Sequence, residues 1–489
     1  MSLRNGEFHA LLDDASGAPA DYVRDVAWTK RALERWMVDR KFRDRFAEDA
    51  ETALKEIGAP LVPEQLYPLL GDGGEASGNE REVPVSVLRY QEFVNEKLSY
   101  RRALRAHGQE TSDQRMAAWR RRQLKRCVGE LGASRSEAIV HAPAAFELSK
   151  GCTVGCWFCG VAAPKFDHNL PYTEDNAELW RTTLGTMKSV VGESLSDAFL
   201  YWATDPLDNP DYEHYLTDFH RILGRCPQTT TAIGHKDVER TRRLLELARD
   251  LGSKVDRFSI IGTSLLHQLH DAFTAEELLR VECIPQNKEA AKLYRKSNAG
   301  RARKFAHKRG DELVPEASSS TIACVSGFLF NMVERSVQLI TPCNASDRWP
   351  LGYWVLDKGT FDTGAELGEL VEAMIARSMR TRLRLGDPVR LRSDVQVTLE
   401  EGLLVASSLG QRMTLAQKDL EDVAECLTEG MASAEDFAIR RERRTGTPLP
   451  ETLAWLNMLF DEGLLDEEPE PAESGRTPVA LGMPGRAAS

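Results

Sequence analysis

The sequence predicts an α/β protein with a parallel sheet at its centre, helices outside the sheet, and a smaller region at each end. Its 489 residues, 42% hydrophobic and 28% charged, suffice for a large core and several domains. In residues 141–385, short β-type runs alternate with amphipathic runs, which is typical of a parallel sheet, open or closed into a partial (β/α)6 barrel of TIM type. Active residues are expected at the carboxyl ends of the strands. The predicted strands are AAFELS, AFLYWA, TTTAI, RFSIIG, RVECIP and VQLITP.

Residues 1–140 are predicted to form a helical N-terminal region. Apolar residues from Val23 to Ile57 recur at helical spacing, and Gly58 ends the pattern. A glycine-rich stretch then predicts a linker near residues 71–84.

Arginines recur between Tyr100 and Arg126, beside Trp119. We interpret them as a solvated helix face, with a docking face for an acidic peptide or nucleic acid as the alternative. No function is assigned to them.

The C-terminal part has a different pattern. Residues 386–467 predict a compact module of winged-helix type, in which three short strands precede helices. Residues 468–489 are rich in Pro, Glu, Gly and Ala without hydrophobic periodicity, which predicts a disordered tail.

Composition narrows the class of protein. The net charge of −12 argues against wholesale nucleic-acid binding. We expect a cytoplasmic protein without a membrane segment, because neither a leader pattern nor a long apolar run occurs. Nine cysteines, three of them within one short loop, favour a metal or catalytic role over a disulfide framework.

That loop, FELSKGCTVGCWFCG, places Cys152, Cys156 and Cys159 in a C-x3-C-x2-C pattern directly after a predicted strand. Three thiolates can hold a [4Fe-4S] cluster and leave one iron open for a further ligand. The alternatives are a zinc knuckle, which His168 could complete, and three unrelated core thiols. No paired C-x2-C or H-x3-H partner follows at zinc-finger spacing.

In spacing and position the loop resembles that of the radical S-adenosylmethionine (SAM) superfamily. The resemblance implies one [4Fe-4S] cluster whose open iron binds SAM, and a partial barrel over residues 141–385. It also implies an electron donor such as flavodoxin or ferredoxin. The cofactors would then carry the difficult chemistry.

Candidate SAM contacts lie at other strand ends. In YWATDPLDNPDY, Thr204 and Asp205 stand where the superfamily usually has a Gly-Gly-Glu-like stretch, and a carboxylate could bind the SAM ammonium group. Plain turn chemistry of Asp-Pro and Asn-Pro is the alternative. Ser259 and Lys236, the latter beside His235, are further candidates for ribose or carboxylate contacts.

Two other cysteines could donate a hydrogen atom, which a radical enzyme needs in order to invert a stereocentre. Cys343 directly follows a predicted strand, at the expected mouth of the barrel. Cys324 lies at what the sequence indicates is a helix start. Either could instead be an inert buried thiol, and position favours Cys343.

Three motifs resemble the radical SAM peptide epimerases of proteusin-type pathways, which convert L-residues to D-residues in ribosomally made precursor peptides. They are LSKGCTVGCWFCG, YWATDPLDNPDY and ACVSGFLFNMVERSVQLITPCNASDRWPLGY, and the resemblance covers about residues 141–364. It implies a cysteine donor, which maps to Cys343 better than to Cys324. The departure from the Gly-Gly-Glu-like pattern at Asp205 puts the SAM ammonium contact in question. A radical SAM enzyme forming thioether or C–C cross-links is the alternative.

Residues 386–467 resemble the winged-helix recognition element related to the pyrroloquinoline quinone peptide chaperone. The resemblance implies that a precursor's leader adds a strand to this module's sheet. A DNA-binding winged helix, or a non-catalytic zinc regulator, is the competing interpretation. DNA binding would need a basic recognition helix, whereas residues 415–427 are acidic. Residues 440–444 form a later basic cluster.

Overall fold

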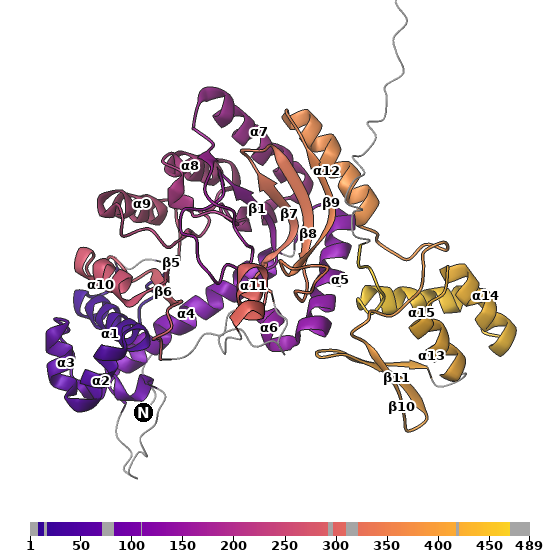
Figure 1. The fold of residues 1–489 in the computed structure, drawn as a ribbon, viewed down its shortest axis with the longest axis horizontal. Coiled ribbons are helices and arrows are strands. Elements are labelled where there is room, and N and C mark those ends of the chain that lie inside the picture. Colours follow the sequence, from indigo (N-terminus) through magenta and orange to yellow (C-terminus); the bar gives the residue numbers. More distant parts are fainter. Residues whose placement is uncertain are drawn as a thin grey trace, which may run out of the picture.

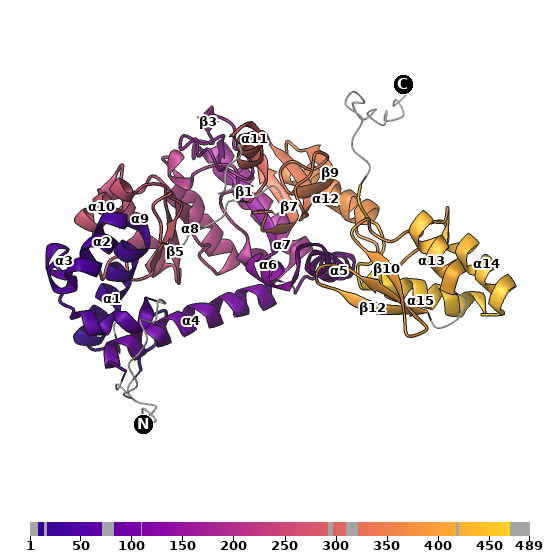
Figure 2. The same ribbon diagram turned by 60° about the horizontal axis from the view of Figure 1, so that its bottom comes forward.

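The computed structural model describes residues 8–13, 17–70, 83–108, 110–291, 297–309, 321–416 and 420–469. The predicted linker and tail lie outside these residues, apart from 83–84 and 468–469. Three parts follow one another in space: N-terminal helices, a central α/β part and a C-terminal module (Figures 1 and 2). Of the helices in the described ranges, none has the length and apolarity needed to cross a membrane.

The N-terminal region is helical, as predicted, but the long helical pattern is divided by two aspartates. Asp39 accepts hydrogen bonds from the backbone N–H groups of Lys41 and Phe42, and Asp49 accepts one from that of Thr52. Each therefore caps a new helix. The elements are α1 (Ala20–Val38), α2 (Arg40–Glu48), α3 (Ala50–Glu56), η2 (Pro63–Gln65), η3 (Tyr67–Leu69), α4 (Val85–His107), α5 (Gln114–Leu131) and α6 (Ala133–Ala138).

The central part is a mixed α/β structure built on two main sheets. One sheet has the order β1-β7-β8-β9, with β1 and β7 parallel and the last two pairs antiparallel. The other has the order β4-β5-β6 and is parallel. The strands are β1 (Ala142–Glu147), β4 (Thr230–Thr231), β5 (Asp256–Ile260), β6 (Val281–Pro285), β7 (Val325–Asn331), β8 (Ser336–Pro342) and β9 (Tyr353–Thr360).

The described strands do not close into a barrel. The predicted strand AFLYWA forms only an isolated parallel bridge, Ala145 to Phe199, beside β1. VQLITP is a strand, but it is antiparallel to its neighbours. Cys324 precedes strand β7 and not a helix, so that prediction was wrong. Both faces of β7 are buried, and a short apolar run of this kind cannot be told from a buried helix by periodicity.

Helices cover the outer face of the β1-β7-β8-β9 sheet (Figure 1). Phe146 of β1 stacks on Phe330 of β7 at 4.8 Å and meets Trp180 of α7 edge-on at 5.1 Å. The remaining central elements are β2 (Ser149–Lys150), β3 (His168–Asn169), α7 (Glu174–Val191), η4 (Glu193–Asp197), η5 (Pro206–Asp208), α8 (Tyr212–Leu223), α9 (Val238–Asp250), α10 (Thr263–Ala272), α11 (Gly300–Arg309) and α12 (Gly364–Ser378).

The C-terminal module has the predicted three strands followed by helices, around a core of its own. Its strands form an antiparallel meander in the order β10-β11-β12. The elements are β10 (Gln396–Glu400), β11 (Leu403–Ser407), β12 (Arg412–Ala416), α13 (Leu420–Glu429), α14 (Ala434–Thr445) and α15 (Leu449–Asp461).

The module is attached to the central part through α5 (Figure 2). Arg122 forms an ion pair of 2.7 Å with Glu467 and lies over the ring of Phe460 at 3.8 Å. Arg120, Arg122 and Arg126 are fully buried, so the interpretation of the arginines as a solvated face was wrong for these three, although Arg121 is exposed. Burial of an arginine depends on which neighbours pack over the helix, which a local pattern does not show.

Candidate functional site

The cysteine loop begins five residues after β1 and folds back on itself. The backbone N–H of Cys152 donates to the carbonyl of Pro164 at 3.0 Å, and Ala163 N–H donates to the Cys159 thiol sulfur at 3.4 Å. Gly151 has φ +80°, and a Cβ there would lie 2.2 Å from the Lys165 carbonyl oxygen. Only glycine therefore allows the loop to close at this point.

The three predicted ligands are brought together. Burial, and after it the neighbouring Cys152 and Cys159, raise the pKa of Cys156 to about 11. No three of these thiols and His168 have ligand atoms within 4.8 Å of one another. Two thiolates on one tetrahedral zinc lie only about 3.8 Å apart. An all-thiolate set with wider spacing fits an iron–sulfur cluster, whose ligands bind separate irons.

A second predicted motif braces the loop. The Asp208 carboxylate accepts hydrogen bonds from Thr153 N–H at 2.9 Å and from the Thr153 hydroxyl at 2.6 Å. The Asn209 side chain donates to the carbonyls of Leu148 and Leu170, on both sides of the loop. Sequence reasoning singled out this segment but missed these two residues, because their partners lie about 40 to 60 positions away along the chain.

Asp205 lies beside the loop with its carboxylate already engaged. It accepts hydrogen bonds from Leu207 N–H, the Thr231 hydroxyl and Ala232 N–H, the last two at 2.7 Å. Burial raises its pKa to about 6 against these hydrogen bonds. The side chain thus ties this turn, which includes half-buried Thr204, to β4. Its role as a SAM contact stays a prediction.

The weaker candidates lie at neighbouring strand ends. Ser259 is half-buried and one residue beyond the last β4–β5 pair, Thr231 with Phe258. Lys236 is exposed in the turn after β4, and burial followed by the Lys236 charge lowers the pKa of His235.

Cys343 is buried at the end of β8 against α5. Its thiol pKa is raised by burial and then by Glu130 of α5, while Arg126 acts to lower it. The next residue, Asn344, donates its N–H to Glu130 and its side-chain amide to the Glu130 carbonyl. The geometry therefore places Cys343 against a helix.

Cys324 lines a cavity of about 350 Å³. Val161 of the cysteine loop and Ile322 also line it, and Ile322 packs on Gly160 closely enough to exclude a Cβ there. Trp202 also lines it, with a buried indole N–H that interacts with the Tyr353 hydroxyl. The cavity thus joins the loop to a free thiol. Most of the rest of its wall comes from α4, residues 196–201, residues 225–228 and the strands β5 and β6 with their flanking residues. Apolar side chains alternate there with six charged ones, Lys97, Arg101, Asp197, Arg225, Arg257 and Glu282.

Glu147, at the end of β1, was missed from the sequence. It is 8% exposed and accepts hydrogen bonds from Ala203 N–H at 2.7 Å and from the Asn331 side chain at 3.1 Å. Burial raises its pKa to about 7. The only available signal was one acidic residue within an otherwise apolar strand.

Another cluster of side chains has the spacing of a metal site, but its groups are already engaged in ion pairs and hydrogen bonds. The ligand atoms of Glu34, His270 and Cys283 lie within 4.8 Å of one another. Lys30 is 2.6 Å from the Glu34 carboxylate, and Arg35 donates to the Nδ1 atom of His270. Burial acts to raise the pKa of Glu34, but Lys30 and then His270 hold it near 2. The network docks α1 on α10 and β6, and a metal would have to displace its cations.

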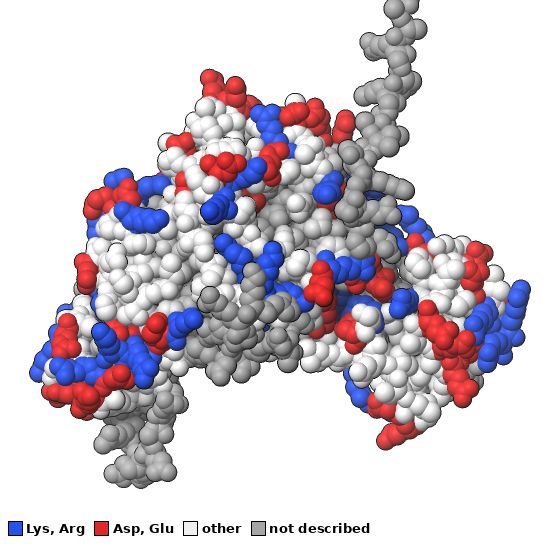
Figure 3. All heavy atoms as spheres, in the orientation of Figure 1, with Lys and Arg blue, Asp and Glu red and all other residues white. Residues whose placement is uncertain are grey.

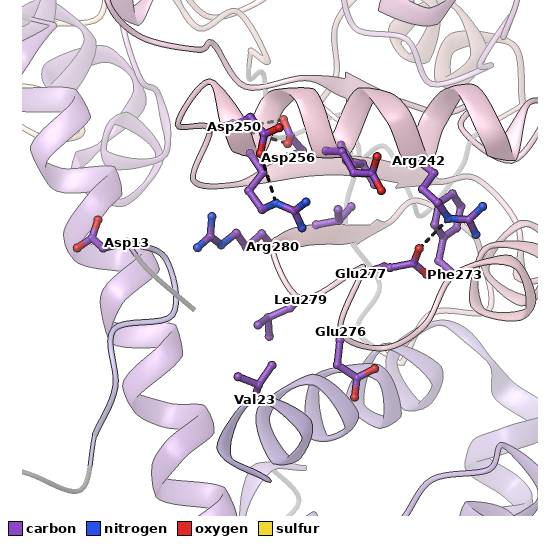
Figure 4. A pocket seen from close by; sticks show the side chains of 15 residues that line it. Asp13, Val23, Arg242, Asp250, Asp256, Phe273, Glu276, Glu277, Leu279 and Arg280 are labelled. Carbon is purple, nitrogen blue, oxygen red and sulfur yellow. Dashed lines mark hydrogen bonds and ion pairs between the residues drawn. The ribbon is translucent and has the colours of Figure 1, made fainter. Parts of the chain in front are cut away.

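Another hollow, of about 560 Å³, lies where the segment with Asp13 meets α9 (Figure 4). None of its lining residues belongs to the cysteine loop. Arg242 and Glu277 form an ion pair of 2.7 Å within it. We assign it no function.

Charge on the visible face is mixed, with acidic and basic side chains interspersed (Figure 3). In the C-terminal module, Arg440 and Arg444 both form ion pairs with Asp422, at 2.7 and 2.9 Å. The basic cluster proposed for DNA is thus partly neutralised.

The fold and site define an α/β protein with a three-thiol loop after the first strand of its sheet. No family model matches the chain. It is 37% identical over 456 residues to the uncharacterized protein y4wI of Sinorhizobium fredii (strain NBRC 101917 / NGR234), covering 91% of this chain and 88% of that protein. The chain therefore belongs to the same family as y4wI.

Among solved structures, a match covers 40% of this chain and 70% of the other, at 13% identity and a TM-score of 0.27. That structure is BtrN in complex with AdoMet and 2-DOIA. A similarity this low establishes neither fold nor function.

Proposed function

We propose that the protein is a radical SAM enzyme that converts L-residues to D-residues in a precursor peptide. The observation that carries the proposal is the convergence of Cys152, Cys156 and Cys159 in one braced loop, next to a cavity lined by Cys324. When bound, the cluster and SAM would supply a 5′-deoxyadenosyl radical, which removes a Cα hydrogen from the peptide.

The residues of the chain would position the peptide and complete the inversion. The cavity accommodates a side chain and its neighbouring amides. Its wall combines apolar surface with polar groups, as ligand pockets do.

The geometry favours Cys324 as hydrogen-atom donor over Cys343. Cys324 faces the cavity, whereas Cys343 packs against α5. The thiol S–H bond breaks as the new Cα–H bond forms, and the sulfur is left as a thiyl radical. One electron from a flavodoxin- or ferredoxin-type donor and one proton from water would restore the thiol.

The C-terminal module would bind the leader. Within the described residues β12 pairs only with β11, so its outer edge can accept an added strand. The acidic helix α13 and the paired arginines of α14 favour a peptide over DNA.

Anaerobic reconstitution tests the proposal. The wild-type protein should bind about four irons, turn brown and cleave SAM under reduction, and Cys159→Ser should lose these properties while Cys426→Ser keeps them. Incubation with a precursor peptide in heavy water should then place deuterium at an inverted Cα without other mass change.

Three outcomes would contradict the proposal. A colourless zinc protein would indicate a regulator. Loss of two hydrogens from the product would indicate a cross-linking enzyme. A D-residue without deuterium would exclude a thiol donor.

A further inference from the structure

Arg301 is a cation at the cysteine loop for which the described residues supply no ion-pair partner. It lies in the first turn of α11, and its backbone N–H donates to the Cys159 carbonyl at 2.9 Å. Its side chain is half-buried, and its Nε atom is buried with no hydrogen-bond partner. Among the described residues no carboxylate pairs with its guanidinium.

The fully buried arginines of the described residues differ from half-buried Arg301. Each is bound by carboxylates or backbone carbonyls, as burial of a charge requires. These pairs are Arg31 with the carbonyls of His270 and Phe273, Arg120 with those of Gly108, His141 and Ser326, Arg122 with Glu467, Arg126 with Glu130, and Arg392 with Asp394. Arg441 of α14 also has unpaired guanidinium nitrogens, but it lies over the Trp455 ring at 4.8 Å. Arg301 lies at the three thiols, which indicates that its partner is an anion that the chain does not supply.

The backbone fixes Arg301 against the loop. Gly300 has φ +55°, and a Cβ there would lie 2.2 Å from the Gly160 carbonyl oxygen. Further along α11, Phe305 packs on the Trp157 ring at 4.7 Å. Its charge also lies near enough to the Cys156 thiol to interact with it electrostatically.

A carboxylate matches a guanidinium best, because two parallel N–H donors meet two oxygens. We infer that Arg301 binds the carboxylate of SAM and so positions it on the open iron. This inference rests on the proposed function. It assigns a positioning residue that the C-x3-C-x2-C motif does not contain.

The test compares SAM binding by reconstituted wild-type protein, Arg301→Gln and Arg301→Lys, with Arg303→Gln as the matched control. Arg303 lies on the same helix and pairs with Asp347. Iron content and absorbance report the cluster, and calorimetry gives the Kd. We expect full cluster in all variants, a rise in Kd of about tenfold or more for Arg301→Gln, partial recovery with Lys, and no change for Arg303→Gln.

Decarboxylated SAM provides the second arm, as in a double-mutant cycle. Wild-type protein and Arg301→Gln should bind it equally. Equal losses for SAM and decarboxylated SAM would show a merely structural role and overturn the inference, as would an unchanged Kd for SAM. If the wild-type protein binds no iron, the proposed function fails first and this inference with it.

Discussion

The cysteine loop and the α5 seam both place thiols beside arginines, but they differ in how those arginines are bound. The α5 seam is the contact of α5 with the end of β8, around Cys127, Arg126, Glu130 and Cys343. There Arg126 donates to the Pro342 carbonyl, to Gln123 at 2.7 Å and to Glu130 at 2.5 Å. At the loop, Arg301 has no such partners among the described residues. We interpret Arg126 as part of a contact built for stability and Arg301 as a cation that awaits a ligand.

The largest expected effect comes from replacing each of the two candidate hydrogen-atom donors, Cys324 and Cys343, by serine. Cys324→Ser should abolish formation of the D-residue while SAM cleavage continues, because a hydroxyl does not readily give up a hydrogen atom to a carbon radical. Cys343→Ser should retain the product, since that thiol packs against α5. Mass spectrometry and chiral analysis measure both. The opposite pattern would return the donor role to Cys343.

Arg126→Met should destabilise the fold by about 3–5 kcal/mol, because it leaves the acceptors of a fully buried cation without a partner. Arg121→Met, on the exposed side of the same helix, is the control and should change little. Denaturant unfolding measures both. Arg301→Gln should stay within about 0.5 kcal/mol of the wild type. If Arg301→Gln cost as much as Arg126→Met, the contrast between the two regions would be lost.

Gly300→Ala should destabilise the loop by about 1–3 kcal/mol and lower the iron content after reconstitution. A methyl group there combines a left-handed backbone with a clash against the Gly160 carbonyl. Gly224→Ala isolates the backbone cost, since Gly224 has φ +77° and open space around it. We therefore expect a smaller loss for Gly224→Ala and unchanged iron content. Equal losses in both variants would show that α11 does not hold the loop.

A further prediction concerns pH. Because burial raises the folded-state pKa of Asp205 to about 6, the folded protein binds more protons than the unfolded chain between about pH 4 and 6. Stability should therefore fall as pH rises through this range, by up to about 1.4 kcal/mol per pH unit from this group. Asp205→Asn should flatten that slope, as measured by denaturant unfolding at each pH. An unchanged slope would mean that Asp205 titrates normally.

The sequence predicted what depends on local spacing. The three cysteines, the mixed α/β pattern and the order of elements in the C-terminal module follow from short-range periodicity. The two Asp caps that divide α1, α2 and α3 have the side chains that such caps require, although the helical pattern runs across both positions.

Long-range contacts explain what was missed. Asp208 and Asn209 became visible as braces only when their distant partners were placed. The apolar run of β7 fits a buried helix as well as a strand, so Cys324 was assigned to the wrong element. Arg301 stands out because its side chain has no partner among the described residues, and a sequence pattern does not show which partners a side chain lacks.

The ion pair between Arg122 and Glu467 affects the distance between the C-terminal module and the cavity. Because the C-terminal module is held on α5 by buried contacts, its sheet edge lies at a fixed separation from the cavity. In a peptide bound at both places, this separation would fix the number of residues between the two bound segments, at roughly 3.3 Å of extended chain per residue. The distance between the two binding places would then determine which residue is epimerised, and the identity of that residue's side chain would not.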